Sequence, residues 1–257
     1  MKISDIDETK QPLIEHLIEL RTRLLWSLAA LVAAFLVCFA FSRPLFAILV
    51  QPLVAAGQDR VIFTQVFEAF FVQVRVALFG ALMLAFPVIA TQAWRFVAPG
   101  LYRQEKAALL PFLVATPFLF SLGAAFAYFV AIPVALRFLL GFQGELGGVT
   151  QEALPSVGQY LSFVMQFLFA FGAAFLLPIL LMLLTRAGIL TLDQLVKGRR
   201  YAIVIAFVIA AIFTPPDVVS QLLLAVPLCI LYEVAIVAIR LTERRRARLA
   251  PEETVAE

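Results

Sequence analysis

The sequence YAIVIAFVIAAIFTPPDVVSQLLLAVPLCILYEVAIVAI, residues 201–239, contains two apolar runs that are separated by little more than Thr-Pro-Pro-Asp. As an α-helix, the run Tyr201 to Phe213 would reach about 20 Å, less than the roughly 30 Å hydrocarbon core of a bilayer. Because two consecutive prolines do not continue a helix, the chain must reverse direction there. We predict a helical hairpin whose second helix runs from Val218 to Ile239 and whose tip stops short of the far membrane surface.

The rest of the chain has the composition of an integral membrane protein. Of its 257 residues, 63% are hydrophobic and only 14% are charged, and the mean hydropathy is +0.99. A soluble domain of this length is far less apolar. We therefore predict an all-α integral membrane protein, a single membrane domain (1–257) with six transmembrane helices. Their predicted spans are 24–41, 72–94, 107–132, 157–184, 201–213 and 218–239.

The distribution of basic residues predicts the orientation of these helices. Sixteen of the 20 Lys and Arg residues fall in the tails 1–23 and 240–257 or in the two loops on the same side. Loops rich in Lys and Arg stay in the cytoplasm, so both termini are predicted to be cytoplasmic. On the other side, Ser42–Phe71 and Gly141–Ser156 are predicted to form loops and short helices at the membrane interface.

Residues for catalysis or for binding a metal are missing from the sequence. His16 is the only histidine, and no Gly-x-x-x-x-Gly-Lys loop is present. We predict no catalytic residue, no metal and no cofactor, and hence a protein that is not an enzyme. Two polar residues at membrane depth need a role. We expect Gln166 to bond between helices and Glu233 to be paired or protonated; the alternative is a small-solute secondary transporter that uses both as a midplane polar site.

Two glutamates, Glu15 and Glu19, lie one helical turn apart where the chain enters the first span. If Glu105 of the loop after the second span lies nearby, the carboxylates line a groove that suits a ligand with guanidinium groups, because a carboxylate binds arginine in bidentate fashion. The alternative is that Glu19 pairs locally with Arg23 at i+4. The residues alone favour neither interpretation.

Five motifs, in order, resemble the TatC family, the multispanning subunit of the twin-arginine protein translocase, over nearly the whole chain. They are HLIELRTRL (16–24), FPVIATQAWRFVAPGLYRQEK (86–106), FAYFVAIPVALRF (126–138), YLSFVMQFLFAFG (160–172) and FTPPDVVSQLLLAVPLCILYE (213–233). The resemblance implies six helices in a concave, glove-like arrangement, with short fifth and sixth helices.

The resemblance also implies a function: a receptor for the Arg-Arg signal peptides of folded proteins, which assembles a translocation complex with TatA and TatB type single-span partners. It implies a bacterial inner (plasma) membrane, with a thylakoid membrane as the other possibility. The signal-peptide-binding residues that it implies are Glu19, Glu105, Arg21, Phe96, Pro99, Leu101 and Tyr102. Pro52, Tyr128, Thr214, Asp217 and Gln221 match structural or partner-binding positions.

The sequence departs from the family pattern in the fourth span. Many members carry a glutamate before the x-Pro of that span, whereas this chain has Leu176 there. Gln166 could supply polarity instead, although ten residues of helix place it about 80° around from that face.

Overall fold

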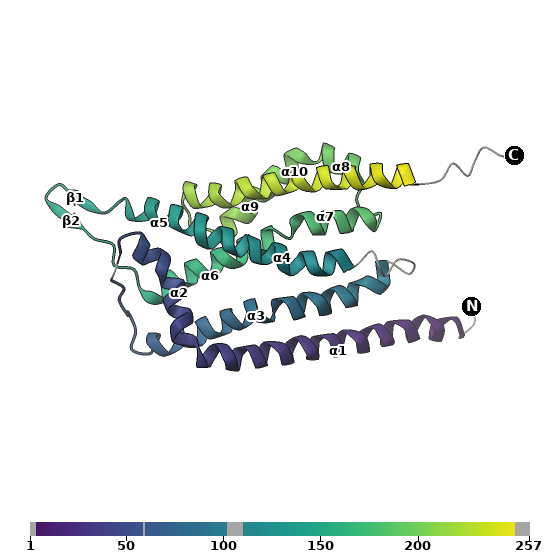
Figure 1. The fold of residues 1–257 in the computed structure, drawn as a ribbon, viewed down its shortest axis with the longest axis horizontal. Helices are drawn as coiled ribbons and strands as arrows, with labels where there is room; N and C mark the ends of the chain where they lie inside the picture. Colours follow the sequence, from purple (N-terminus) through teal and green to yellow (C-terminus); the bar gives the residue numbers. More distant parts are fainter. Residues whose placement is uncertain (1–3, 59, 102–109, 250–257) are drawn as a thin grey trace. The chain divides into compact units, whose positions relative to one another are not determined.

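The computed structural model describes residues 4–58, 60–101 and 110–249 of the chain (Figure 1). These residues are mostly helical. The elements are α1 (Ser4–Ala40), α2 (Ser42–Ala55), α3 (Glu68–Leu101), α4 (Leu110–Phe126), a π-helical turn (Ala127–Ala131), α5 (Ile132–Leu140), β1 (Gly144–Leu146), β2 (Val149–Gln151), α6 (Val157–Ala174), α7 (Leu177–Arg186), α8 (Leu192–Lys197), α9 (Arg199–Phe213) and α10 (Val218–Leu249).

Five helical segments in the described part of the chain are long and apolar enough to cross a membrane. They are His16–Ala40, Glu68–Phe96, Phe112–Leu140, Val157–Arg186 and Val218–Arg244. The remaining predicted span, the fifth (201–213), corresponds to α9, which has only 15 residues. The structure thus confirms a multi-helical chain with long apolar helices, and a count of six spans stays a prediction.

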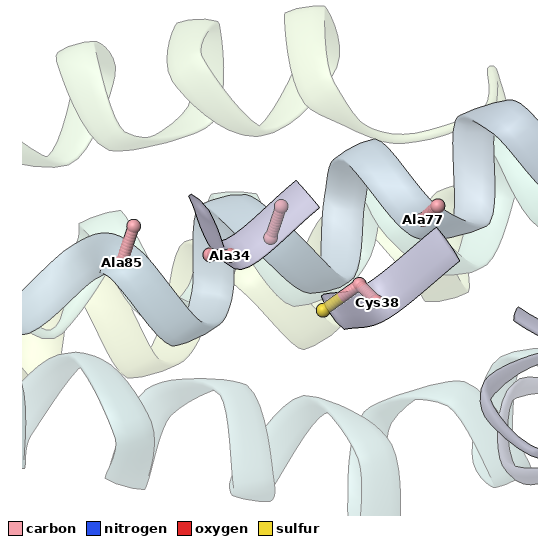
Figure 2. Packing of buried hydrophobic residues seen from close by; sticks show 5 residues of the cluster. Ala34, Cys38, Ala77 and Ala85 are labelled. Carbon is pink, nitrogen blue, oxygen red and sulfur yellow. The ribbon is translucent and has the colours of Figure 1, made fainter. Parts of the chain in front are cut away.

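The chain divides into two compact units. Unit 1 comprises 1–51, 62–117 and 156–161, and unit 2 comprises 52–61, 118–155 and 162–257. In unit 1, α1 and α3 lie side by side (Figure 1). The seam between them consists of small side chains spaced four residues apart: Ala34, Cys38, Ala77, Ala81 and Ala85 (Figure 2). Small side chains let two apolar helices approach closely, which is how helices pack where water supplies no driving force.

In unit 2, α10 lies beside α9 and also contacts α7 and α8 (Figure 1). Leu181 of α7, Leu195 of α8 and Ile236 of α10 belong to one buried cluster. Close approach of helices also depends on a small residue between α4 and α6. A Cβ added at Gly123 of α4 would lie 2.4 Å from the carbonyl oxygen of Phe171 in α6. The helices could not stay this close with any larger residue there.

Two helices extend beyond the apolar spans that the sequence predicted. The sixth helix is not short: α10 has 32 residues and continues to Leu249, ten residues beyond the predicted end of the span. Its extension RLTERRRARL consists mostly of good helix formers, so the helix persists after the apolar segment ends. In the same way α1 is helical from Ser4, within the tail predicted to precede the first span.

Prolines explain two of the other differences. The third helical segment continues to Leu140 rather than ending at Ile132, because the π-helical turn at 127–131 absorbs the disruption and Pro133 starts α5. The fourth segment is interrupted between α6 and α7, where Pro178 occupies the first turn of the new helix. Proline is tolerated in a first turn, where its missing N–H has no helical partner to lose.

The segment 141–156 is not the loop with short helices that the sequence predicted. It contains an antiparallel hairpin in which β1 pairs with β2. The two connecting residues, Gly147 and Gly148, have φ values of 62° and 83°. Positive φ at both turn positions matches the twist of the paired strands and favours Gly-Gly, which is the signal that the sequence interpretation missed.

Candidate functional site

Charged, polar and aromatic side chains meet where the first part of α1 passes the last part of α3. We call the group His16, Glu19, Arg23, Gln92 and Phe96 the α1/α3 site. At its centre is the guanidinium of Arg23. Its Nη2 donates to Glu19 Oε1 at 3.2 Å, and its Nη1 donates to Gln92 Oε1 at 3.2 Å.

The pairing of Glu19 with Arg23 follows from their spacing on α1. Residues at i and i+4 lie on one face of a helix, and a glutamate placed before a basic residue is the favourable order. Both side chains are partly exposed, with 33% of Glu19 and 29% of Arg23 accessible. Arg23 is the only partner of Glu19 within the described residues, and it uses one of the two carboxylate oxygens.

The opposite edge of the site is aromatic. The imidazole of His16 stacks on the ring of Phe96, with the ring centroids 4.3 Å apart and an interplanar angle of 14°. His16 is exposed and Phe96 is partly buried. The stack places an apolar ring within the same group of side chains as the Glu19 carboxylate, a combination that suits a ligand with both cationic and apolar parts.

Trp94 fixes the end of α3, and the sequence interpretation gave it no role. Its Nε1 donates to Thr116 Oγ1 at 2.8 Å, and its ring stacks on Phe112 with centroids 5.8 Å apart. Thr116 in turn donates to the carbonyl oxygen of Phe112 at 2.7 Å. A tryptophan in an apolar segment needs an acceptor for its indole N–H, and this requirement could have identified the contact.

Of the other residues that the resemblance implies for this site, Arg21 is exposed on α1. Pro99 and Leu101 lie in the last turns of α3, where the described part of the chain ends. Tyr102 and Glu105 lie outside the described residues. A groove shared by Glu19 and Glu105 therefore stays a prediction.

Pro52 and Tyr128, which the resemblance also implies, lie in unit 2. Pro52 is buried in α2, where its carbonyl oxygen accepts from the Ala56 N–H at 3.1 Å. Tyr128 lies in the π-helical turn and is half-buried, with its ring edge-to-face against Phe129 at 4.9 Å. A π-helical turn displaces side chains from regular helical positions and often occurs where a helix has a function.

Polar side chains surround the C-terminal end of α9, which we call the α9 tip. Thr214 Oγ1 donates to Ala210 O at 2.8 Å, and Gln221 Nε2 donates to Phe207 O at 3.3 Å. Asp217 Oδ1 accepts from the Ser220 N–H at 2.7 Å and so caps α10. A carboxylate at a helix N-terminus is favoured by the unpaired N–H groups and the helix dipole. Thr214, Asp217 and Gln221 thus hold the Pro-Pro reversal in shape.

Gln166 also reaches the α9 tip. Its Nε2 donates to Ile212 O at 3.4 Å, so the predicted hydrogen bond between helices is confirmed. Carbonyl groups in the last turn of a helix have no intrahelical partner, which explains why a side chain from α6 is useful there. Leu176 is the residue that precedes α7, at the break between α6 and α7.

Glu233 is paired, as the sequence predicted. Its Oε2 accepts from Arg199 Nη2 at 2.8 Å, at the start of α9. Gln166, in contrast, bonds at the end of α9, and the 13 residues from Arg199 to Ile212 separate the two contacts by about 20 Å of helix. Glu233 and Gln166 therefore do not form one polar site, and the structure does not support the small-solute transporter.

Glu68 is a further carboxylate that the sequence interpretation missed. Its Oε1 accepts from the Gly158 N–H at 2.8 Å, while its Oε2 accepts from Thr64 N at 2.5 Å, Thr64 Oγ1 at 3.0 Å and Gln65 N at 3.2 Å. It thus ties the start of α3 to the first turn of α6. An acidic residue in the first turn of a helix is a sequence signal for such a role.

Comparison with known proteins gives one consistent result. Residues 15–227 match the family described as "Sec-independent protein translocase protein (TatC)". The TatC protein of Magnetococcus marinus is 48% identical over 242 residues, 93% of this chain and 88% of the relative. The TatC protein of Escherichia coli K12 is 40% identical over 231 residues, which cover 89% of this chain and 88% of the relative.

A solved structure agrees with these relatives. The crystal structure described as "Twin Arginine Translocase Receptor- TatC" superimposes with a TM-score of 0.77 at 42% sequence identity, and the match covers 89% of this chain and all of that one. The five long apolar helices, the short α9 and the Thr-Pro-Pro-Asp reversal thus occur in a chain that resembles TatC proteins over most of its length. We conclude that the chain belongs to the TatC family and is a membrane component of a protein translocase rather than an enzyme.

Proposed function

We propose that this chain is the receptor of a twin-arginine translocase and binds Arg-Arg signal peptides at the α1/α3 site. The observation that carries the proposal is the environment of Glu19. Its carboxylate is partly exposed, already binds one guanidinium through Oε1, and belongs to the same contact between α1 and α3 as the His16–Phe96 stack. Carboxylates bind arginine in a bidentate, charge-assisted manner, so the site has the chemistry that such a peptide requires.

In this proposal Glu19 and Glu105 bind the two arginines, and the other residues that the resemblance implies (Arg21, Phe96, Pro99, Leu101, Tyr102) shape the site around them. Each charge-assisted contact contributes on the order of 1.5 to 3 kcal/mol. The apolar part of the signal then follows the apolar surface of the helices. No chemical step is required, because binding is followed by assembly of the complex.

We propose that assembly involves TatA and TatB type single-span proteins and further copies of this chain. The α9 tip, with Thr214, Asp217 and Gln221, is the proposed contact for their helices, and Pro52 and Tyr128 are proposed as further structural or partner-binding positions. The tip suits this role because polar side chains in apolar segments form hydrogen bonds between helices.

We further propose that the chain lies in a bacterial inner membrane with six spans in a concave arrangement and with both termini in the cytoplasm. The placement of sixteen of the 20 Lys and Arg residues on one side supports this orientation. The α9 and α10 pair then forms the fifth and sixth spans, and an even number of spans returns the C-terminus to the side of the N-terminus.

Export of a folded reporter with an Arg-Arg signal tests the proposal. We expect Glu19→Lys and Glu105→Lys each to block export in cells that have no other TatC, because reversal replaces an attraction for arginine by a repulsion. Glu152→Lys is the matched control, since Glu152 is exposed and outside the site. Normal export by both site variants would contradict the proposed receptor function.

A further inference from the structure

One face of α10 carries a shallow groove that is lined almost entirely by apolar side chains. The described residues that line it all belong to this helix and lie between Cys229 and Leu241. Ile236 and Ile239, in contrast, are buried in the cluster that α10 forms with α7 and α8. The groove therefore opens on the side of α10 that faces away from this cluster.

The groove has the length and the polarity that suit an acyl chain. From Cys229 to Leu241 it extends for about 18 Å along the helix, and the hydrocarbon region of one leaflet is about 15 Å deep. Its one charged side chain is Glu233, whose Oε2 accepts from Arg199 Nη2 at 2.8 Å. Because this carboxylate is paired, it repels a nearby anion less than a free carboxylate would.

Arginines continue the same face of α10 beyond the groove, in the part of the helix drawn in yellow in Figure 1. Arg240 comes seven residues after Glu233, and Arg244 comes seven residues after Val237. Seven residues make nearly two helical turns, so each arginine lies almost in line with a groove residue. Both arginines are exposed, and neither side chain forms a hydrogen bond or ion pair with another residue that the structure describes.

We propose that this face of α10 binds one anionic phospholipid. An acyl chain lies in the groove, and the phosphate lies between the guanidinium groups of Arg240 and Arg244. Side chains four residues apart on a helix are neighbours, so one phosphate can bond to both. The inference goes beyond the proposed receptor function and takes from it only the orientation of the chain, which places this lipid in the cytoplasmic leaflet.

Charge favours a lipid over a protein helix as the occupant of the groove. An apolar groove by itself fits either of them. A second copy of this chain, packed in parallel through the same face, would bring its own Arg240 and Arg244 to the same depth, and like charges repel. An anionic phospholipid supplies both parts of the complement, an apolar chain for the groove and a negative charge for the arginines.

Native mass spectrometry of the purified full-length protein tests the inference. The probes are phosphatidylglycerol and phosphatidylcholine with identical acyl chains, and the readout is the dissociation constant of the first bound lipid. We expect phosphatidylglycerol to bind more tightly. The double variant Arg240→Gln/Arg244→Gln should weaken its binding by about tenfold or more, because each basic residue near an anionic surface contributes about fivefold in affinity. Phosphatidylcholine binding should change far less, because its ammonium group offsets the charge of its phosphate.

Two control variants separate this site from the net charge of the protein. Arg43→Gln/Arg137→Gln removes the same charge from two exposed arginines outside α10, and we expect it to leave phosphatidylglycerol binding nearly unchanged. Arg240→Lys/Arg244→Lys keeps both charges and should retain most of the affinity. Equal losses in the Arg43/Arg137 and Arg240/Arg244 glutamine variants, or no loss in either, overturns the inference.

Photocrosslinking in lipid nanodiscs locates the acyl chain. The probe is phosphatidylglycerol with a diazirine on one acyl chain, and mass spectrometry identifies the labelled peptides. We expect the label to concentrate between Cys229 and Leu241 and to fall in Arg240→Gln/Arg244→Gln. Equal labelling of the exposed apolar faces of α1 and α10 would show a non-specific lipid shell, and no labelling of α10 would show that a protein helix covers the groove. Either result overturns the inference and leaves the receptor function untouched, since no signal peptide is present.

Discussion

Glu19 and Glu68 are two carboxylates of the same unit, and their surroundings differ sharply. Glu68 accepts four hydrogen bonds, three of them from backbone N–H groups, and both of its oxygens are used. Glu19 accepts one long bond from Arg23 through one oxygen, within the described residues. A carboxylate with all its acceptor positions filled holds structure together, whereas one with unused positions is available to a ligand.

The largest expected effect is on peptide affinity, when each of the two carboxylates is replaced by an amide in turn. We expect Glu19→Gln to weaken binding of an Arg-Arg signal peptide by about tenfold or more, since a charge-assisted pair is lost. Glu68→Gln should change the affinity by less than about twofold, as for most substitutions away from a binding site. Fluorescence anisotropy on both variants measures the difference, and equal losses would remove the distinction between the two carboxylates.

A second experiment addresses the structural role of Glu68. In Glu68→Gln, the amide NH₂ cannot accept from the Thr64 and Gln65 N–H groups, so the start of α3 and the first turn of α6 should open more often. We expect hydrogen exchange at Thr64 and Gly158 to become about tenfold faster, with α1 unaffected. Unchanged exchange at both amides would show that the four bonds do not hold this end together.

Gly158 offers a smaller and more specific perturbation. A Cβ at this position would lie 2.8 Å from Glu68 Oε1, so Gly158→Ala must displace the carboxylate. Because the displaced group is the end of a flexible side chain, we expect a smaller loss of thermal stability than in Glu68→Gln. In the Glu68→Gln background the alanine should cost nothing more, and an additive loss in the double variant would argue against a shared contact.

The smallest effect is expected at Glu233. Its pair with Arg199 is about half exposed on both sides, with 49% and 47% of the side chains accessible. Exposed pairs contribute about 0.2 to 1 kcal/mol. We expect Glu233→Gln to lower the free energy of unfolding by no more than this amount and to leave export intact. Loss of export in a stably folded Glu233→Gln variant would contradict this expectation and indicate that the Glu233 carboxylate takes part in export.

Local patterns in the sequence predicted much of the fold. The long apolar segments and the reversal at residues 214–217 depend on residues close in sequence, and the structure contains both. The Glu19–Arg23 pair, which the sequence left as one of two alternatives, is formed. The helices α1 and α10 extend beyond the predicted apolar spans, because a charged segment of good helix formers stays helical after the apolar segment ends.

Contacts between distant residues were not predictable in the same way. The bonds from Arg23 to Gln92 and from Gly158 to Glu68 join residues 69 and 90 positions apart. They depend on how helices are placed beside one another, which a single sequence does not specify. The seam of small residues in α1 and α3 was a usable signal for part of this placement, because a four-residue repeat of alanine marks a close helix contact.

The shortness of α9 has a consequence for the choice of lipid. Its 15 residues reach about 22 Å, and side chains of Gln166, Thr214 and Gln221 cover carbonyl groups near its end. Side chains of α6 and α10, together with Thr214, therefore supply a polar covering for peptide groups that acyl chains would otherwise meet if this end lies within the bilayer. Longer acyl chains should bury this covering more deeply and strain the reversal, so translocase assembled in thick bilayers should work less well than in thin ones.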